Sequence, residues 1–543
     1  MKKQILFTVA CFMAVVCIKA QSNDIHLNSL GFLPNHTKTA TISKESAVFN
    51  ILDVKGKAVF SGKTTGPYSQ EDVNQKVWKA DFSKFTKSGE YTLEVPGIGK
   101  SGTFKIAKDI FNFAAKTSMR GFYLWRCGME VTDHFNGTQY HQDTCHLEDG
   151  FDDYIGNPNS QRDGTQGWHD AGDYGKYTVN AGITVGMLFM AWDHFQPQIE
   201  KLDLDLPDTA SGLPDFLKEL KWETDWVLKM QYPDGSGKVS HKLTRVNFEG
   251  FVMANTDDGK RYYTEWSSAA TADFVAMMAM AARYFKPYDA EYAKKCLDAA
   301  WVSYRFLQEH PEEKRFVQGD FKTGGYQTRD DDDKLWAAAE LWETTGDKTC
   351  LMDFEKRAAL INHKIDENWD WGNVVNLGMF TYALSKRTDK SPNVDTLIKN
   401  NIIQNADALV EKGKTDAYDR ALGGTYFWGC NGTVARQTMN LQIANMMQPK
   451  KEYIETSIGI IDHIFGKNVY NRSFVTGLGI NPPMHPHDRR SGADGIEAPW
   501  PGYLVGGGHK ATDWIDDQES YSHNEIAINW QGALVYALMG FVD

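Results

Sequence analysis

The segment Trp168–Tyr177 combines two carboxylates, two glycines and flanking aromatic rings within ten residues. Asp170 and Asp173 lie three residues apart around Ala171-Gly172, where a glycine lets the backbone bend and approach a neighbour closely. Two carboxylates at this spacing can share one catalytic water or one metal ion. The alternative interpretation is an Asp-rich surface turn, so the choice depends on the rest of the chain.

A second acidic segment lies near the C-terminus and contains Asp516, Tyr521 and Glu525. Glu525 begins a strongly apolar run that ends the chain. A carboxyl group among aromatic and apolar neighbours has a raised pKa, which a general acid needs. The alternative is a glutamate at a helix N-terminus, where the helix dipole favours negative charge.

A loop rich in His, Arg and Pro lies between the two acidic segments, at residues 482–490. Its His487 and Arg489 are fixed hydrogen-bond donors of the kind that sugar hydroxyls need. A rigid, solvated surface loop is the alternative. Shortly after it, Trp500 stands between two prolines, which would hold the ring for stacking on a sugar or for packing.

Two kinds of element must position these segments. Residues 24–107 alternate in the strand manner with turn residues at short intervals, which predicts a small β-sandwich. After residue 110 the apolar period becomes helical, most clearly over Leu213–Leu228. About a dozen such helical segments, joined by long loops rich in Gly, Asp, His and Trp, predict a toroid of helix pairs with its function on loops at one end.

Composition narrows the class of ligand. At 543 residues the chain is long enough for two or more domains. Its net charge of −13 argues against nucleic-acid binding, which needs a basic surface. Its 16 Trp, 23 Tyr and 29 Phe are more than a core needs and suit a groove that stacks on flat, neutral rings. We therefore expect a neutral substrate.

Residues 1–20 have the pattern of a signal peptide. Lys2 and Lys3 give the positive start, and residues 5–18 form an apolar run that is too short to span a membrane comfortably. No other stretch is a transmembrane candidate. We expect an exported protein in the periplasm, at the cell surface or in the medium, and a monomer.

The two acidic segments and the His-Arg loop, in this order, resemble glycoside hydrolase family 9. The residues that carry the resemblance are the Asp-Ala-Gly-Asp-Tyr block, the segment Ser473–Arg489 and the segment Trp514–Ala527. Asn28–Pro34 and Gly89-Glu90-Tyr91 resemble the immunoglobulin-like domain that precedes many such catalytic domains. The resemblance covers nearly the whole mature chain.

The resemblance implies a multidomain protein: an all-β immunoglobulin-like sandwich over 24–107, then an all-α (α/α)6 barrel over 110–543. It also implies inverting hydrolysis of β-1,4-glucans, with two carboxyl groups roughly 6.5–9.5 Å apart. Asp173 would be the general base, Asp170 its partner on the water, and Glu525 the general acid. The remaining implied residues, which bind substrate or orient the acid, are His487, Arg489, Tyr521 and Asp516.

Four further residues make a Cys2His2 set, which tetrahedral zinc accepts, although their spacing is wider than in a zinc finger. They are Cys127, Cys145, His146 and His169. For an exported protein a Cys127–Cys145 disulfide is the alternative. The resemblance favours a structural zinc near the active-site loop, because related enzymes with this N-terminal domain carry one.

An acidic run, Asp330–Asp333, is the second candidate for a metal. Hard oxygen ligands suit calcium, and the resembling family often has calcium near this position. Asp332, Asp333 and Asp370 are the candidate ligands. A solvated acidic face is the alternative. No organic cofactor is expected.

The favoured function is an exported endo-β-1,4-glucanase acting on cellulose, mixed-linkage glucan or xyloglucan. One alternative within the same chemistry is an exo-acting β-glucosidase or glucosaminidase on short oligosaccharides, which loops closing one end of the groove would produce. A different class is a non-catalytic glycan-binding protein on the same scaffold. The joint presence of Asp170, Asp173 and Glu525 speaks against that class.

Overall fold

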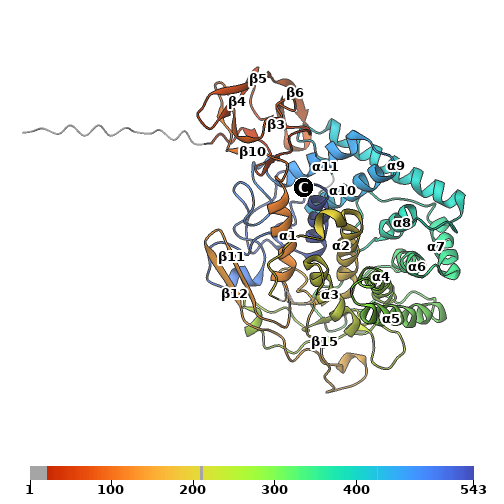
Figure 1. The fold of residues 1–543 in the computed structure, drawn as a ribbon. Helices are drawn as coiled ribbons and strands as arrows, with labels where there is room; N and C mark the ends of the chain where they lie inside the picture. Colours follow the sequence, from red (N-terminus) through yellow and green to blue (C-terminus); the bar gives the residue numbers. More distant parts are fainter. Residues whose placement is uncertain (1–20, 208–211, 425) are drawn as a thin grey trace, which may run out of the picture.

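The computed structural model describes residues 21–207, 212–424 and 426–543, so the predicted signal peptide lies outside the described residues. Its strands β1 to β10 lie in the N-terminal part and its helices α1 to α14 follow (Figure 1). The change from a period-2 to a helical pattern after residue 107 predicted this order.

The N-terminal part is a sandwich of two sheets. One sheet has the order β1-β3-β7-β6, and the other has the order β2-β10-β8-β4-β5 with β9 paired to β8. The side chains between the sheets form one buried cluster, in which the Phe32 and Phe82 rings meet edge to face at 5.1 Å. The strands are β1 Ile25–His26, β2 Gly31–Phe32, β3 Thr39–Ile42, β4 Val48–Asp53, β5 Ala58–Lys63, β6 Thr65–Gln70, β7 Gln75–Asp81, β8 Gly89–Val95, β9 Gly99–Lys100 and β10 Phe104–Ile106.

The second part is built mainly from helices. They are α1 Asn112–Leu124, α2 Thr178–Ile199, α3 Asp215–Met230, α4 Ser268–Phe285, α5 Ala290–Glu309, α6 Asp331–Thr345, α7 Lys348–Leu360, α8 Val375–Leu384, α9 Pro392–Thr415, α10 Cys430–Met447, α11 Lys451–Ile464, α12 Arg489–Ala493, α13 Tyr521–Asn524 and α14 Ile528–Met539. The helix predicted over Leu213–Leu228 is confirmed as α3.

Alternate helices form an inner layer that runs from the first long helix to the last. Helix α2 packs on α4, α4 on α6, and α6 on α8, while α10 packs on α14 and α14 returns to α2. The step from α8 to α10 includes a hydrogen bond at 3.5 Å from Asn376 Nδ2 to Asn440 Oδ1. Buried residues surround α4 and α14 on all sides, whereas outer helices such as α5 are amphipathic, as expected for an inner and an outer layer.

Short strands and a hairpin interrupt the helices on the loop side. The hairpin is β11 Val131–Phe135 with β12 Thr138–Gln142, and the small sheet is β13 Lys176–Tyr177, β14 Lys242–Thr244 and β15 Tyr262–Tyr263. In this sheet Tyr177 is paired with Lys242. The sheet holds the end of the Asp170–Tyr177 segment directly before α2.

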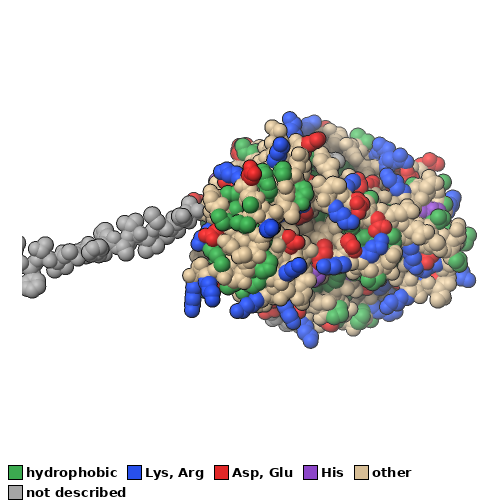
Figure 2. Space-filling model, turned by 90° about the horizontal axis from the view of Figure 1, so that it is seen from above, with side chains coloured by type: hydrophobic (Ala, Val, Ile, Leu, Met, Phe, Trp, Pro, Cys, Tyr) green, Lys and Arg blue, Asp and Glu red, His purple; other side chains and the backbone are tan. Residues whose placement is uncertain are grey.

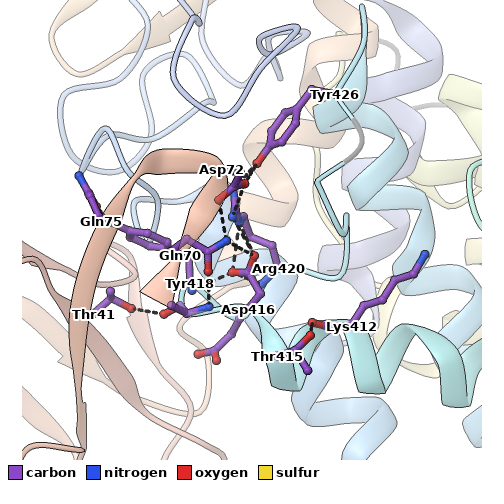
Figure 3. Close-up of polar contacts among 12 residues, drawn as sticks. Thr41, Gln70, Asp72, Gln75, Lys412, Thr415, Asp416, Tyr418, Arg420 and Tyr426 are labelled. Atoms are coloured by element: carbon purple, nitrogen blue, oxygen red, sulfur yellow. Dashed lines mark hydrogen bonds and ion pairs between the residues drawn. The ribbon is translucent and has the colours of Figure 1, made fainter. Parts of the chain in front are cut away.

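The sandwich contacts the segment between α9 and α10 through a buried polar cluster (Figure 3). Arg420 Nη2 donates to Asp416 Oδ2 and to Asp72 Oδ2, each at 2.8 Å, and Tyr426 donates to the same Asp72 oxygen at 3.0 Å. The Gln70 side chain accepts from Ala417 N at 2.8 Å. Strands β6 and β7 and the 310 turn Glu71–Val73 therefore fix a segment that leads toward Trp428.

Acidic and basic side chains are interspersed on the face shown in Figure 2, with no continuous basic patch. This distribution agrees with the expectation from the net charge. Within the part of the chain that the structure describes, no helix combines the length and apolarity that crossing a bilayer requires.

Candidate active site

Asp170 and Asp173 occupy the turn that leads into β13 and α2. Asp170 is buried, and its two carboxylate oxygens accept hydrogen bonds from Asn180 Nδ2 at 2.7 Å and from the Tyr326 hydroxyl at 2.6 Å. Asp173 Oδ2 accepts from the Tyr177 hydroxyl at 2.8 Å and from Gly175 N at 3.0 Å. Each carboxylate is thus held by a phenol.

Burial raises the pKa of Asp170 well above its usual range, and the neighbouring charge of Asp173 raises it further. The hydrogen bonds from Tyr326 and Asn180 oppose this shift without cancelling it. The two carboxyl groups therefore differ in environment, which is the condition for different roles in proton transfer.

Glu525 comes to the same place from the far end of the chain. Its backbone lies beside His487 in an isolated bridge, and its carbonyl oxygen accepts from Gly506 N at 2.8 Å. Burial raises the pKa of Glu525 well above its usual range, and the charges of Asp173 and Asp170 add to the rise. Arg489 and a hydrogen bond with Trp428 act in the opposite direction. Glu525 therefore keeps its proton at a higher pH than a free glutamate.

The three carboxyl groups line one cavity of about 440 Å³. Four rings complete its wall and supply faces on which a sugar could stack: Phe248, Trp371, Trp428 and Trp530. Two of them, Phe248 and Trp428, are 45% and 46% exposed, so part of each ring is accessible to a ligand.

The predicted substrate-binding residues lie beside Glu525 rather than among the residues that line this cavity. His487 Nδ1 donates to the Gln518 carbonyl at 2.7 Å, and the His487 ring lies 6.0 Å from that of Tyr521. Tyr521 is exposed and also contacts the Trp428 ring at 5.4 Å. Arg489 is buried and pairs with Glu249 Oε1 at 2.8 Å.

Asp516, which was expected to bind substrate or to orient the acid, lies outside the cavity wall. Its carboxylate accepts from the backbone nitrogens of Met484 and His485 at 2.9 Å and from Arg472 at 2.8 Å. Burial raises the pKa of Asp516, but these hydrogen bonds outweigh it and the net shift is downward. Asp516 does not line the cavity and holds the His487 loop in position.

The three candidate calcium ligands, Asp332, Asp333 and Asp370, have different surroundings. Asp370 lines the active-site cavity, pairs with Arg436 at 2.5 Å and accepts from Asn529 at 2.7 Å. Asp332 instead accepts from Val374 N at 2.6 Å, and Asp333 is buried beside Asp273. The run of acidic residues in the sequence does not indicate that these side chains contact different partners.

The set of Cys127, Cys145, His146 and His169 does come together. One donor atom from each lies within 4.8 Å of all the others, and this is the sole such group of three or more found among the described residues. Cys127 and Cys145 are free thiols, so the alternative disulfide is not formed. His146 Nε2 faces Asp257 at 3.2 Å while Nδ1 faces the cluster, as in a carboxylate–histidine–metal arrangement. The donor set fits a tetrahedral metal ion.

Several residues that build the site were not predicted. Tyr177 was inside the segment singled out, but its bond to Asp173 depends on the turn geometry. Tyr326, Trp428 and Arg436 come from separate loops and helices and carry no motif. A tyrosine, a tryptophan or an arginine in such a loop gives no sequence signal of its own.

A helical domain that brings two paired aspartates and one protonated glutamate into an aromatic-walled cavity defines a glycoside hydrolase. The sequence matches the Glycosyl hydrolase family 9 over residues 111–538 and the Cellulase N-terminal ig-like domain over residues 20–100. The chain therefore belongs to glycosyl hydrolase family 9, and the resemblance noted from its motifs is confirmed.

Three similar proteins illustrate this membership. Endoglucanase D of Acetivibrio thermocellus is 54% identical over 521 residues, which cover 96% of this chain and 83% of that protein. A protein of Bacteroides ovatus described as a xyloglucan-specific endo-beta-1,4-glucanase is 32% identical, over 99% of this chain and 97% of its own. A solved structure described as a Zn-binding triple mutant of a family 9 endoglucanase, J30, is 29% identical with a TM-score of 0.88, over 94% and 99% of the two chains.

Proposed function

We propose that this protein is an inverting endo-β-1,4-glucanase. The observation that carries the proposal is the meeting of Asp173, Asp170 and Glu525 in one aromatic-walled cavity of a family 9 chain. The 54% identity to a protein named endoglucanase D supports the endo-acting class. A neutral glucan also suits the net charge of −13 and the exposed rings.

In this proposal Asp173 is the general base and Glu525 is the general acid. Asp173 takes a proton from the water whose oxygen forms the new bond to the anomeric carbon. Glu525 gives its proton to the glycosidic oxygen as the old bond to that carbon breaks, so charge and protons balance. The raised pKa of Glu525 keeps it protonated for this step.

Asp170 is assigned to the same water. Its two oxygens are held by Tyr326 and Asn180, so its position is fixed before the substrate arrives. Such preorganisation removes orientational freedom from the attacking water. His487 and Tyr521 are proposed to extend the substrate-binding surface beyond Trp428. Buried Arg489 is proposed to favour the ionised forms of the carboxyl groups of Glu249 and Glu525.

The scaffold proposed for this site is an immunoglobulin-like domain over 24–107 followed by an (α/α)6 barrel over 110–543. The barrel is supported by the order of the inner helices, which are α2, α4, α6, α8, α10 and α14. Each packs on the next, and α14 packs on α2, so that the ring closes. The outer helices α3, α5, α7 and α11 each pack mainly on the inner helix that precedes them in the chain, which is α2, α4, α6 or α10. Export by the signal sequence at residues 1–20 completes the proposal, since the polymeric substrate lies outside the cell.

The Cys2His2 cluster is proposed as a structural zinc site. Cys127, Cys145, His146 and His169 would hold the ion, which would brace the turn behind Asp170 because His169 adjoins that residue. Zinc bound by four protein ligands supplies stability and has no open position for a substrate.

Product analysis tests the function. The protein is incubated with soluble cellulose, barley mixed-linkage glucan, xyloglucan and chitosan, with products resolved by size and the first anomer followed by NMR. A ladder of β-glucan oligomers with the α anomer formed first is expected. A single small product would favour the exo-acting alternative, a β anomer would exclude inversion, and activity on chitosan alone would favour the glucosaminidase.

A further inference from the structure

Two adjacent side chains at the start of β14, His241 and Lys242, hold the loop 323–326, which borders the catalytic carboxylates. Lys242 is buried, and its Nζ donates to Gly324 O at 2.8 Å, to Thr323 Oγ1 at 3.1 Å and to Gln318 Oε1 at 2.7 Å. The preceding residue, His241, has its Nε2 at 2.8 Å from Gly325 O. The carbonyl groups of the neighbouring residues Gly324 and Gly325 are therefore held by the neighbouring side chains of Lys242 and His241.

The His241 ring is held on both nitrogens. Burial lowers the pKa of His241 to about 3, so the ring is neutral at the pH of hydrolysis. Nε2 then carries the proton and donates to Gly325 O, while Nδ1 accepts from the Ser267 hydroxyl at 2.8 Å. The ring also stacks on Phe316 at 4.3 Å. This fixes where the Gly325 carbonyl can lie.

Loop 323–326 is connected to both aspartates by hydrogen bonds. Gly324 N donates at 3.1 Å to the Tyr177 hydroxyl, which in turn donates to Asp173 Oδ2. Two residues further on, the Tyr326 hydroxyl donates to Asp170 Oδ2. The loop therefore orients the two phenols that orient the two carboxylates.

Tyr326 has a left-handed backbone, with φ of 42°. For a residue other than glycine such a conformation is strained and persists only where the surroundings enforce it. The bonds from Lys242 and His241 to residues 323–325 supply that enforcement directly before Tyr326.

Lys242 makes no ion pair with any described residue, although its ammonium group is buried. Burial lowers the pKa of Lys242 to about 7, and the charge of Asp173 partly opposes this. Burying an amino group is costly, and Lys242 has only neutral oxygens as hydrogen-bond acceptors, with the Phe321 and Phe316 rings 4.9 and 5.2 Å from Nζ, so it is poorly explained as an ion-pairing element. Its partners instead connect it to the reaction.

We propose that Lys242, together with His241, is a positioning residue that holds loop 323–326 so that Tyr177 and Tyr326 present their hydroxyls to Asp173 and Asp170. This inference deepens the proposed function and rests on it. Lys242 itself touches neither the substrate nor the reacting atoms.

The test compares Lys242→Met with wild type on a soluble cello-oligosaccharide. We expect kcat to fall about 10- to 100-fold and KM to stay within about twofold. In a double-mutant cycle the loss of kcat should not add to that of Tyr177→Phe, because Lys242 acts through the Tyr177 hydroxyl. A merely structural role would lower the melting temperature and the active fraction, and its loss would add to that of Tyr177→Phe.

Lys322→Met is the matched control, since Lys322 is an exposed lysine just before the loop. Its kinetics and pH profile should equal wild type. If Lys242→Met does not fold, Gln318→Leu decides, because Gln318 is only partly buried and bonds both Lys242 and Thr323 O. The same non-additivity with Tyr177→Phe is expected, on a smaller loss of kcat.

Additive losses in the folded variants overturn the positioning role, whatever the change in kcat. The failure of the proposed function gives a different result. Wild type would then be inactive on every β-1,4-glucan, or Asp173→Asn would be as active as wild type. The two outcomes are distinguished in one set of assays.

Discussion

Gly172 lies against the carbonyl oxygen of His487 so closely that a Cβ on Gly172 would be only 2.1 Å from it. The Gly172 carbonyl in turn accepts from Arg489 N at 3.1 Å. The turn that carries Asp170 and Asp173 and the loop that carries His487 therefore meet backbone to backbone. A side chain between them is sterically excluded.

Gly172→Ala should consequently displace the aspartates while leaving every catalytic side chain chemically unchanged. Because a misplacement of about 1 Å costs about 100-fold in rate, we expect a loss of kcat of that order. Gly250→Ala is the control and should be kinetically silent, because Gly250 is exposed and an added Cβ there would meet no atom within 4 Å. Equal kcat in Gly172→Ala and wild type would show that the contact is not needed for alignment.

The roles of Glu525 and Asp173 can be separated by leaving-group chemistry. Glu525→Gln and Asp173→Asn should each lower kcat on a cello-oligosaccharide by about 10²- to 10⁴-fold. On a dinitrophenyl cellobioside the leaving group needs no proton, so Glu525→Gln should recover most of its activity. Asp173→Asn should not recover, because water must still be activated. Recovery of Asp173→Asn alone would reverse the assignment of acid and base.

The Trp428 ring gives a prediction about the basic limb of the pH profile. Activity requires protonated Glu525, and burial followed by the charges of Asp173 and Asp170 raises the pKa of Glu525, while a hydrogen bond with Trp428 lowers it. Trp428→Phe removes that bond, so the pKa should rise and the basic limb should move to higher pH. Trp371→Phe, at another ring of the cavity, is the control. A shift to lower pH in Trp428→Phe would contradict this electrostatic account.

The Cys2His2 cluster predicts about one zinc per chain by elemental analysis. Removing zinc that had been present at one hundred times its Kd should lower the free energy of unfolding by about 3 kcal/mol. Cys145→Ser should lose the metal, whereas Cys296→Ser, at a buried thiol outside the cluster, should keep it. Equal zinc content in the two variants would place the metal elsewhere.

The contact between the sandwich and the helical domain predicts unequal effects at Arg420 and Asp72. Arg420→Met leaves Asp416 buried without its cation, so the free energy of unfolding should fall by about 3–5 kcal/mol. Asp72 is 23% exposed at its side chain, and Asp72→Asn should cost about 1 kcal/mol or less. Thermal unfolding measures both. An equal loss in the two variants would mean that the Asp416 pair contributes little.

The division into strands and helices could be predicted because each element buries its side chains with its own period. The helix over Leu213–Leu228 is an example, since its apolar stripe faces the core in α3. Inner helices such as α4 are buried on all sides and show no stripe, so the sequence does not indicate which way they face. Their order around the ring depends on packing between distant segments.

The site was predictable where its residues share a motif and not where they meet through the fold. Asp170, Asp173 and Glu525 were found in this way and lie together. Tyr326 reaches Asp170 across 156 positions of the chain, and no local pattern signals that contact. The place of Asp370 in the cavity wall was missed for the same reason, since an acidic side chain shows its charge in the sequence but not its direction.

The inner layer has a consequence for the order in which the enzyme becomes active. Asp170 and Asp173 directly precede α2, Glu525 directly precedes α14, and Ile528 N donates to the Asp170 carbonyl at 2.8 Å where these two helices pack. The general acid thus joins the aspartates only when α14 has docked on α2. A chain that lacks α14 and the segment before it holds half of the proton-transfer pair and is inert.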